Sequence, residues 1–100
     1  NKRAKMGKVA DNFSDKIYLT DDNPRYEDPQ IIRSEIIKYC PKAIEVPSRK
    51  KAILEAIKKL KKNNILIIAG KGHEKIQIYK NKNIKFDDLK IVKKICKNLK

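Results

Sequence analysis

Residues 17–37 read IYLTDDNPRYEDPQIIRSEII and carry a strand, a loop and a helix in immediate succession. Residues 17–20 are mostly apolar, which predicts a brief strand. The stretch 21–29 is too rich in Asp, Asn and Pro to continue either a strand or a helical period. Asp28 and Pro29 then predict a helix start, because Asp caps free backbone amides and proline suits the first helical position. The chain is therefore expected to leave a sheet, form a polar loop and return along a helix.

The same alternation of strand and helix extends through the rest of the chain. Helical spacing of apolar residues, together with capping residues, predicts helices, and short apolar or alternating runs predict strands. We expect helices over about 3–13, 29–39, 49–62 and from 87 onward, and strands over 17–20, 43–46, 65–69 and 76–79, the last with a partner strand. This order predicts an α/β layered domain with a mostly parallel sheet and one late antiparallel strand.

Two of these elements carry specific packing expectations. In the first helix, Met6, Val9, Ala10 and Phe13 recur at helical spacing and are expected to form one apolar stripe. The run Ile65–Ala69 is continuously apolar, which is typical of a strand covered on both faces. Ligands bind at the carboxyl ends of strands in such sheets, so the loops that follow the predicted strands are the places to search for a site.

Length and composition limit the class of protein. With 100 residues, 40% of them apolar, the chain can form one domain with a core. It carries 26 Lys and Arg against 12 Asp and Glu, a formal net charge of +14, but only four of these bases are arginine. Proteins that read nucleic acids usually use arginine, so the charge is weak support for such a partner. The longest apolar run has five residues, far below the roughly 20 that a membrane-spanning helix needs.

The acidic residues are concentrated around the first loop. Six of the twelve acids fall within residues 11–28, where Lys16 and Arg25 are the only bases, so this segment has a local charge of −4. A single arginine among carboxylates suits a zwitterionic ligand, because Arg25 can bind a carboxylate through two parallel hydrogen bonds while nearby acids hold an ammonium. The alternative is a solvated turn in which Asp22 and Arg25 pair with each other.

The segment Gly70–Glu74, GKGHE, is the second unusual loop after a predicted strand. Its glycines suggest a phosphate loop, but the dinucleotide pattern needs a third glycine where Lys75 stands, and the phosphate-binding lysine pattern needs a following Ser or Thr. Taken alone, the segment is a tight turn. His73 is the only histidine, and Cys40 and Cys96 lack metal-ligand spacing, so we expect no metal site and interpret the cysteines as buried thiols of a cytosolic protein.

Taken together, the two loops resemble the signature of the Mur ligases, in particular of the members that add diaminopimelate to the peptidoglycan stem peptide. The motifs that carry the resemblance are Asp22-Asn23-Pro24-Arg25 continued by Glu27-Asp28-Pro29, and about 45 residues later Gly70-Lys71-Gly72-His73-Glu74 with Gln77. Further residues fit the C-terminal domain of that family in order and spacing, namely Arg3, Met6, Gly7, Ala10, Arg49, Ala52, Ile53 and Phe86-Asp87-Asp88. The resemblance covers essentially the whole chain.

The resemblance implies a Rossmann-like three-layer domain that is N-terminally truncated, so that residues 1–100 lack the first strand. It implies that the whole protein is an ATP-dependent, amide-forming ligase, with ATP and Mg²⁺ bound mainly outside this fragment. The other substrate, a UDP-MurNAc-dipeptide, would be bound by the missing domains. The fragment alone is expected to be inactive, and the protein to be a cytoplasmic monomer with no nucleic-acid partner and no membrane span.

The resemblance also implies which residues bind meso-diaminopimelate. Asn23 and Arg25 would bind its distal carboxylate, whereas the Gly70 carbonyl and Glu74 would bind its distal ammonium. Diaminopimelate differs from lysine by one carboxylate, so Arg25 would be left without its partner when lysine binds. The fragment is expected to hold no catalytic residue and no metal ligand. The full set of expected substrate-binding residues is Asp22, Asn23, Pro24, Arg25, Gly70 and Glu74.

Two alternatives remain open. Another Mur-type ligase or a folylpolyglutamate synthetase would share this domain but take a different amino acid, and a comparison of glutamate, lysine and diaminopimelate as substrates separates these enzymes. A basic nucleic-acid-binding module would rest on the +14 charge, and it requires binding that weakens steeply with salt.

Overall fold

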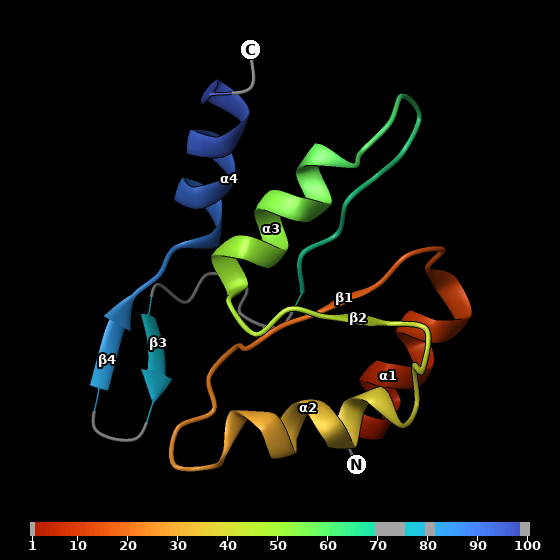
Figure 1. Cartoon of the computed structure of the whole chain (residues 1–100), viewed down its shortest axis with the longest axis vertical. Helices are drawn as coiled ribbons and strands as arrows, with labels where there is room; N and C mark the ends of the chain where they lie inside the picture. The colour runs from red at the N-terminus through yellow and green to blue at the C-terminus, as the bar shows by residue number, and fades with distance from the viewer. Residues whose placement is uncertain (1, 70–75, 80–81, 99–100) are drawn as a thin grey trace.

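The computed structural model describes residues 2–69, 76–79 and 82–98, and it places helices on both sides of a short strand pair (Figure 1). In chain order the elements are α1 (Lys2–Phe13), β1 (Tyr18–Leu19), α2 (Pro29–Ile37), β2 (Ile44–Glu45), α3 (Arg49–Lys58), β3 (Ile76–Tyr79), β4 (Lys82–Lys85) and α4 (Asp88–Asn98).

The strands form two separate pairs. β1 and β2 are parallel, with Tyr18 opposite Ile44 and Leu19 opposite Glu45, whereas β3 and β4 are antiparallel. In Figure 1 the β1–β2 pair runs between α3 on one side and α1 with α2 on the other, and the β3–β4 hairpin lies beyond the loop that follows β1. The predicted α/β class, with parallel pairing first and an antiparallel pair late in the chain, is confirmed.

The second and third helices begin where their capping residues predict. The Asp28 carboxylate accepts a hydrogen bond of 2.9 Å from the backbone N–H of Gln30, and the Ser48 hydroxyl accepts one of 3.3 Å from Lys51. Each bond satisfies an amide that lacks a partner within its helix. The third helix ends at Lys58, earlier than the expected position near residue 62.

The core is small and is centred on α3. This helix turns its small and branched residues toward β1 and α4, as its spacing predicts. The buried apolar residues among those described are Leu19, Cys40, Ala52, Ile53, Ala56 and Ile95.

The helix α1 forms as predicted, but three of the four side chains of its apolar stripe lie exposed. The helix buries Gly7 against the end of α2, where a Cβ atom on residue 7 would lie 2.7 Å from the Tyr39 Cβ and 2.9 Å from the Ile36 carbonyl oxygen. Only glycine permits so close an approach. Within the apolar stripe, Ala10 is half-buried, whereas exposure runs from 49% at Met6 to 84% at Phe13.

The expectation of a doubly covered strand at Ile65–Ala69 is also wrong. The segment joins no strand ladder among the described residues. Ile65 and Ile67 are 86% and 81% exposed, whereas Leu66 and Ile68 are half-buried, so only one face of the segment is covered. A strand forms only where a neighbour supplies backbone partners, and the described part of the chain places none beside this run.

Two further expectations concern membranes and thiols. Within residues 2–69, 76–79 and 82–98, no helix has the length and apolar character needed to cross a bilayer. Cys40 is buried, as predicted, and its burial raises the pKa of its thiol. Cys96 is exposed, contrary to prediction, because α4 turns its neighbour Ile95 inward instead.

Candidate functional site

The loop Asp22–Arg25 lies against β3. The Asn23 side-chain oxygen accepts a hydrogen bond of 2.8 Å from the Ile78 N–H, and the Arg25 N–H donates one of 2.8 Å to the Ile78 carbonyl. Arg25 and Tyr79 thereby form an isolated parallel bridge. The polar loop predicted from sequence is thus fixed to a strand that lies more than fifty residues further along the chain.

The residues just after this loop are anchored by α1. Pro24 is buried, and its carbonyl accepts a hydrogen bond of 3.0 Å from the Glu27 N–H. The Arg3 guanidinium then binds Glu27 at 2.7 Å and Glu35 at 2.6 Å. The hydrogen bond from Arg3 lowers the pKa of Glu27 below its usual value, and those to Glu27 and Glu35 raise the pKa of Arg3.

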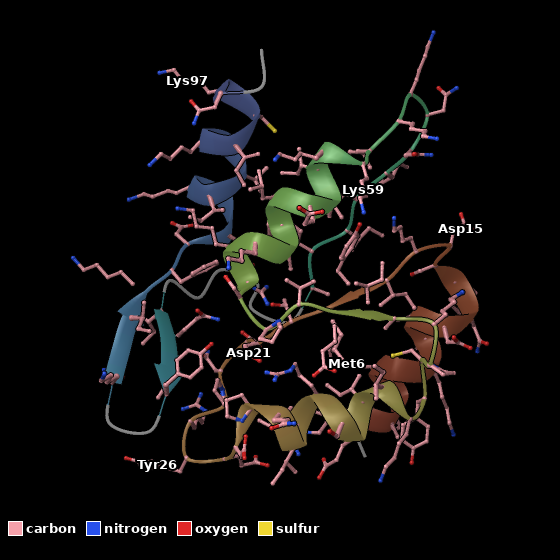
Figure 2. All side chains as sticks on the ribbon, viewed as in Figure 1. Met6, Asp15, Asp21, Tyr26, Lys59 and Lys97 are labelled. Atoms are coloured by element: carbon pink, nitrogen blue, oxygen red, sulfur yellow. The ribbon has the colours of Figure 1, made fainter. Side chains whose placement is uncertain are left out.

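The base of the loop is a cluster around Asp21, which Figure 2 shows between β1 and α2. One Asp21 carboxylate oxygen accepts from the Arg33 guanidinium, and the other accepts from the Tyr79 hydroxyl at 3.0 Å. The Gln77 amide donates to the backbone carbonyls of Asp21 and Asp22, at 3.1 Å each. We call Asp21, Arg33, Gln77 and Tyr79 the Asp21 cluster.

The protonation states of this cluster follow from its surroundings. Burial works to lower the pKa of Arg33, but hydrogen bonds with Glu45 and Asp21 outweigh that effect and leave it above its usual value. Burial, followed by the nearby Asp21 charge, raises the pKa of Tyr79 to about 12. Near neutral pH, Arg33 is therefore charged and Tyr79 is a neutral hydroxyl that donates to Asp21.

Arg49, the first residue of α3, joins this loop to the segment 65–69. The guanidinium is 4% exposed and binds the Asp88 carboxylate through two nitrogens, at 2.8 and 2.7 Å. It also donates to the Asp21 carbonyl at 3.4 Å and to the Ala69 carbonyl at 3.2 Å. Asp21, at the start of the first unusual loop, and Ala69, the last described residue before the second, therefore meet at one guanidinium.

Arg25 differs from the other three arginines of the chain. Arg3, Arg33 and Arg49 each bind at least one carboxylate. The Arg25 side chain is exposed, and within the part of the chain that the structure describes its guanidinium has no ion pair, with Asp22 or any other acid. Its φ is 59°, a left-handed value that is uncommon and costly for a residue with a Cβ atom. The backbone is held in place while the guanidinium reaches into solvent.

Four of the six predicted site residues lie together in this loop. Gly70 and Glu74 lie outside the described residues, so their roles stay predictions. Sequence reasoning did not single out Arg33 or Tyr79, which are 12 and 58 residues from Asp21. The rarity of arginine among so many lysines was a signal for Arg33, but no sequence pattern pointed to Tyr79.

The described side chains include one that is suited to binding an anion. No group of three or more His, Cys, Asp and Glu residues among them could hold a metal ion. A guanidinium without a carboxylate, fixed at its backbone, suits an external carboxylate, which it can bind through two parallel hydrogen bonds. The arrangement can therefore recognise an acid group on a ligand.

Comparison with known proteins gives one consistent result. Residues 1–72 match the family model described as Mur ligase, glutamate ligase domain. A protein from Rickettsia typhi named UDP-N-acetylmuramoyl-L-alanyl-D-glutamate--2,6-diaminopimelate ligase is 50% identical over 95 residues, which are 93% of this chain and 19% of that protein. A protein of the same name from Anaplasma marginale is 48% identical over 88 residues, which are 87% of this chain and 19% of that protein.

A solved structure of a 2,6-diaminopimelate ligase of this name has the same fold as the chain. It matches with a TM-score of 0.89 and 30% sequence identity, over 98% of this chain and 21% of its own. This chain thus spans about a fifth of the length of the proteins that it matches.

Proposed function

This chain belongs to the Mur ligase family, and from that premise we propose that it is the C-terminal domain of a ligase that adds meso-diaminopimelate to UDP-N-acetylmuramoyl-L-alanyl-D-glutamate in peptidoglycan synthesis. In this proposal residues 1–100 form the domain that binds and orients the incoming diaminopimelate. The names of the relatives support the reaction, and the geometry of the loop Asp22–Arg25 supports the role of the domain.

The Arg25 guanidinium is the observation that carries the proposal. Its backbone is fixed by the 2.8 Å hydrogen bond to Ile78, and its side chain has no carboxylate partner among the residues described. A fixed cation of this kind supports recognition of a carboxylate that arrives with a ligand. Asn23 holds the loop through its side-chain oxygen, which accepts from the Ile78 N–H, and its amide nitrogen is the atom that would donate to a carboxylate.

The same residues support a preference for diaminopimelate over lysine. The two amino acids differ by one carboxylate, which Arg25 would bind in the first and lack in the second. We propose that the Gly70 carbonyl and Glu74 bind the distal ammonium; both lie outside the described residues. With its distal end held in this way, the remaining amine would point toward the activated acyl group.

We place the chemical step in the rest of the protein. The glutamate carboxylate of the dipeptide would take the γ-phosphoryl group of ATP, with release of ADP, to form an acyl phosphate. The amine would then attack its carbonyl carbon, form the amide and release phosphate and a proton. ATP and Mg²⁺ would bind mainly outside this chain, as the resemblance to the family implies. The fragment alone would then be inactive, and the whole protein would act in the cytoplasm as a monomer.

The test is Arg25→Gly in the full-length protein. Glycine removes the guanidinium and adopts a positive φ without strain. We expect the KM for diaminopimelate to rise by at least roughly 10- to 100-fold, because even a single hydrogen bond to a charged group contributes about 1.5–3 kcal/mol. The KM for ATP should stay unchanged, and the melting temperature should not fall.

Lys59→Ala is the matched control, because it removes one exposed charge from the end of α3, away from the loop (Figure 2). Parallel increases in the KM for ATP and for diaminopimelate would contradict the role of Arg25. A wild-type protein that prefers glutamate or lysine to diaminopimelate would indicate a related ligase instead.

A further inference from the structure

The Asp21 cluster is buried to a degree that separates it from surface ion pairs. The Asp21 and Arg33 side chains are 8% and 11% exposed, and Gln77 is 5% exposed. Charges taken out of water are stable only where their partners satisfy them in a specific geometry. Here each carboxylate oxygen of Asp21 receives its own donor, one from Arg33 and one from Tyr79. The cluster therefore defines where Asp21 lies.

Asp21 also directly precedes the loop Asp22–Arg25, which we propose binds the substrate. Tyr79 contacts this loop twice, because its hydroxyl donates to Asp21 and its backbone forms the bridge with Arg25. Arg33 approaches from α2, the helix that follows the loop, and its other donor binds Glu45 at 2.6 Å. The Asp21 end of the short span from Asp21 to Arg25 is thus held by the side chains of Arg33 and Tyr79, and the Arg25 end is held by the backbone of β3.

We propose that Tyr79 and Arg33 are positioning residues for the binding of diaminopimelate, and that they act through Asp21 to fix the place of the Arg25 guanidinium. The inference rests on the proposed function for the identity of the ligand. Arg25 has a flexible side chain on a backbone whose location depends on the loop. Displacement of that backbone by about 1 Å would spoil the paired hydrogen bonds to a carboxylate.

Tyr79→Phe in the full-length protein tests this most cleanly, because it removes only the hydroxyl. We expect the KM for diaminopimelate to rise roughly 3- to 10-fold, less than for Arg25→Gly because the guanidinium remains and only its placement is disturbed, with kcat and the KM for ATP unchanged. Arg33→Lys, which keeps the charge but cannot bind Asp21 and Glu45 together through one planar group, should produce the same pattern. Glu45→Gln is the matched control, since it alters the other partner of Arg33 and leaves Asp21 intact.

A double-variant cycle separates positioning from general damage to the fold. If Tyr79 acts by placing Arg25, then adding Tyr79→Phe to Arg25→Ala should raise the KM for diaminopimelate by less than twofold further. The same fold-increase in both backgrounds would overturn the proposal. An unchanged KM in the single variant would overturn it as well.

Amide hydrogen exchange decides the structural part without any ligase activity. The Arg25 N–H bonds to Ile78 and the Glu27 N–H bonds to Pro24, so a peptide spanning the loop contains two protected amides. Tyr79→Phe should speed their exchange, whereas Glu45→Gln should not, and equal exchange in wild type and Tyr79→Phe would overturn the proposal. If wild type and Arg25→Gly use diaminopimelate equally poorly, the proposed function fails, and the exchange result still decides whether Tyr79 fixes the loop.

Discussion

The loop 21–28 follows the strand β1, and the segment 65–69 comes after the helix α3. The two differ in how they are held in place. The loop is polar and is fixed from three directions, by α1 through Arg3, by α2 through Arg33 and by β3 through Ile78. The segment is apolar and forms no ladder among the described residues, with Ile65 and Ile67 exposed. Polar side chains fix a loop through individual hydrogen bonds, whereas an apolar strand forms only beside a neighbouring strand and with other residues packed over its faces.

Arg49 links the two regions, and its removal should have the largest effect on stability. Arg49→Met would leave the Asp88 carboxylate and the carbonyls of Asp21 and Ala69 without their shared donor. Breaking a buried ion pair from one side typically costs about 3–5 kcal/mol, and we expect a loss of that size in the free energy of unfolding of the chain, measured with urea. The neighbouring exposed base provides the control, and Lys50→Met should change stability little. A loss below about 1 kcal/mol would show that the two regions are held together by other contacts.

Gly7 tests whether the loop depends on the docking of α1. In Gly7→Ala the new methyl group would meet the Tyr39 Cβ and the Ile36 carbonyl, and α1, which carries Arg3, would have to move away. Overpacking costs about 1–3 kcal/mol, partly offset by the roughly 0.5–1 kcal/mol that alanine adds in a helix. We expect a net loss of about 1–2 kcal/mol in urea denaturation.

Asn12→Ala is the control for that substitution, because residue 12 lies exposed on the same helix. Alanine there raises the helix propensity without causing a clash. If Gly7→Ala is as stable as wild type or more so, α1 does not pack closely on α2 and the described contact is wrong.

The smallest effect should come from the exposed face of the segment 65–69. The double variant Ile65→Thr, Ile67→Thr should change the free energy of unfolding of the 100-residue chain by no more than about 0.5 kcal/mol, because both side chains already lie in solvent. Ile53→Ala, at a residue that is 4% exposed, should cost about 2–5 kcal/mol in the same assay. Equal losses in the two variants would mean that the segment is covered after all.

What the sequence predicted correctly depends on contacts between close neighbours in the chain. Asp28 and Ser48 cap their helices through residues two and three positions ahead, and both helix starts are confirmed. The position of the loop Asp22–Arg25 after a strand is confirmed for the same reason, since turn chemistry is local. Its role in binding diaminopimelate stays a prediction.

The errors concern partners that are distant in the chain. The apolar stripe of α1 was predicted from local spacing, but the close approach at Gly7 depends on α2, roughly thirty residues away. The strand at 65–69 was predicted from composition, which does not show whether another strand lies beside it. Tyr79 was missed because its partner Asp21 is 58 residues away and nothing about an alternating strand marks one tyrosine.

The positive φ at Arg25 has a consequence for how the proposed specificity for diaminopimelate could be lost. Every arginine codon becomes a glycine codon by a single base change, and glycine is the residue that relieves this backbone conformation. A lineage that no longer needed the distal carboxylate would therefore be expected to drift to glycine at this position without any structural barrier. Gaining a new side chain there would be harder, because a branched residue is strained at this φ. The proposed specificity is therefore easier to lose than to change toward another ligand.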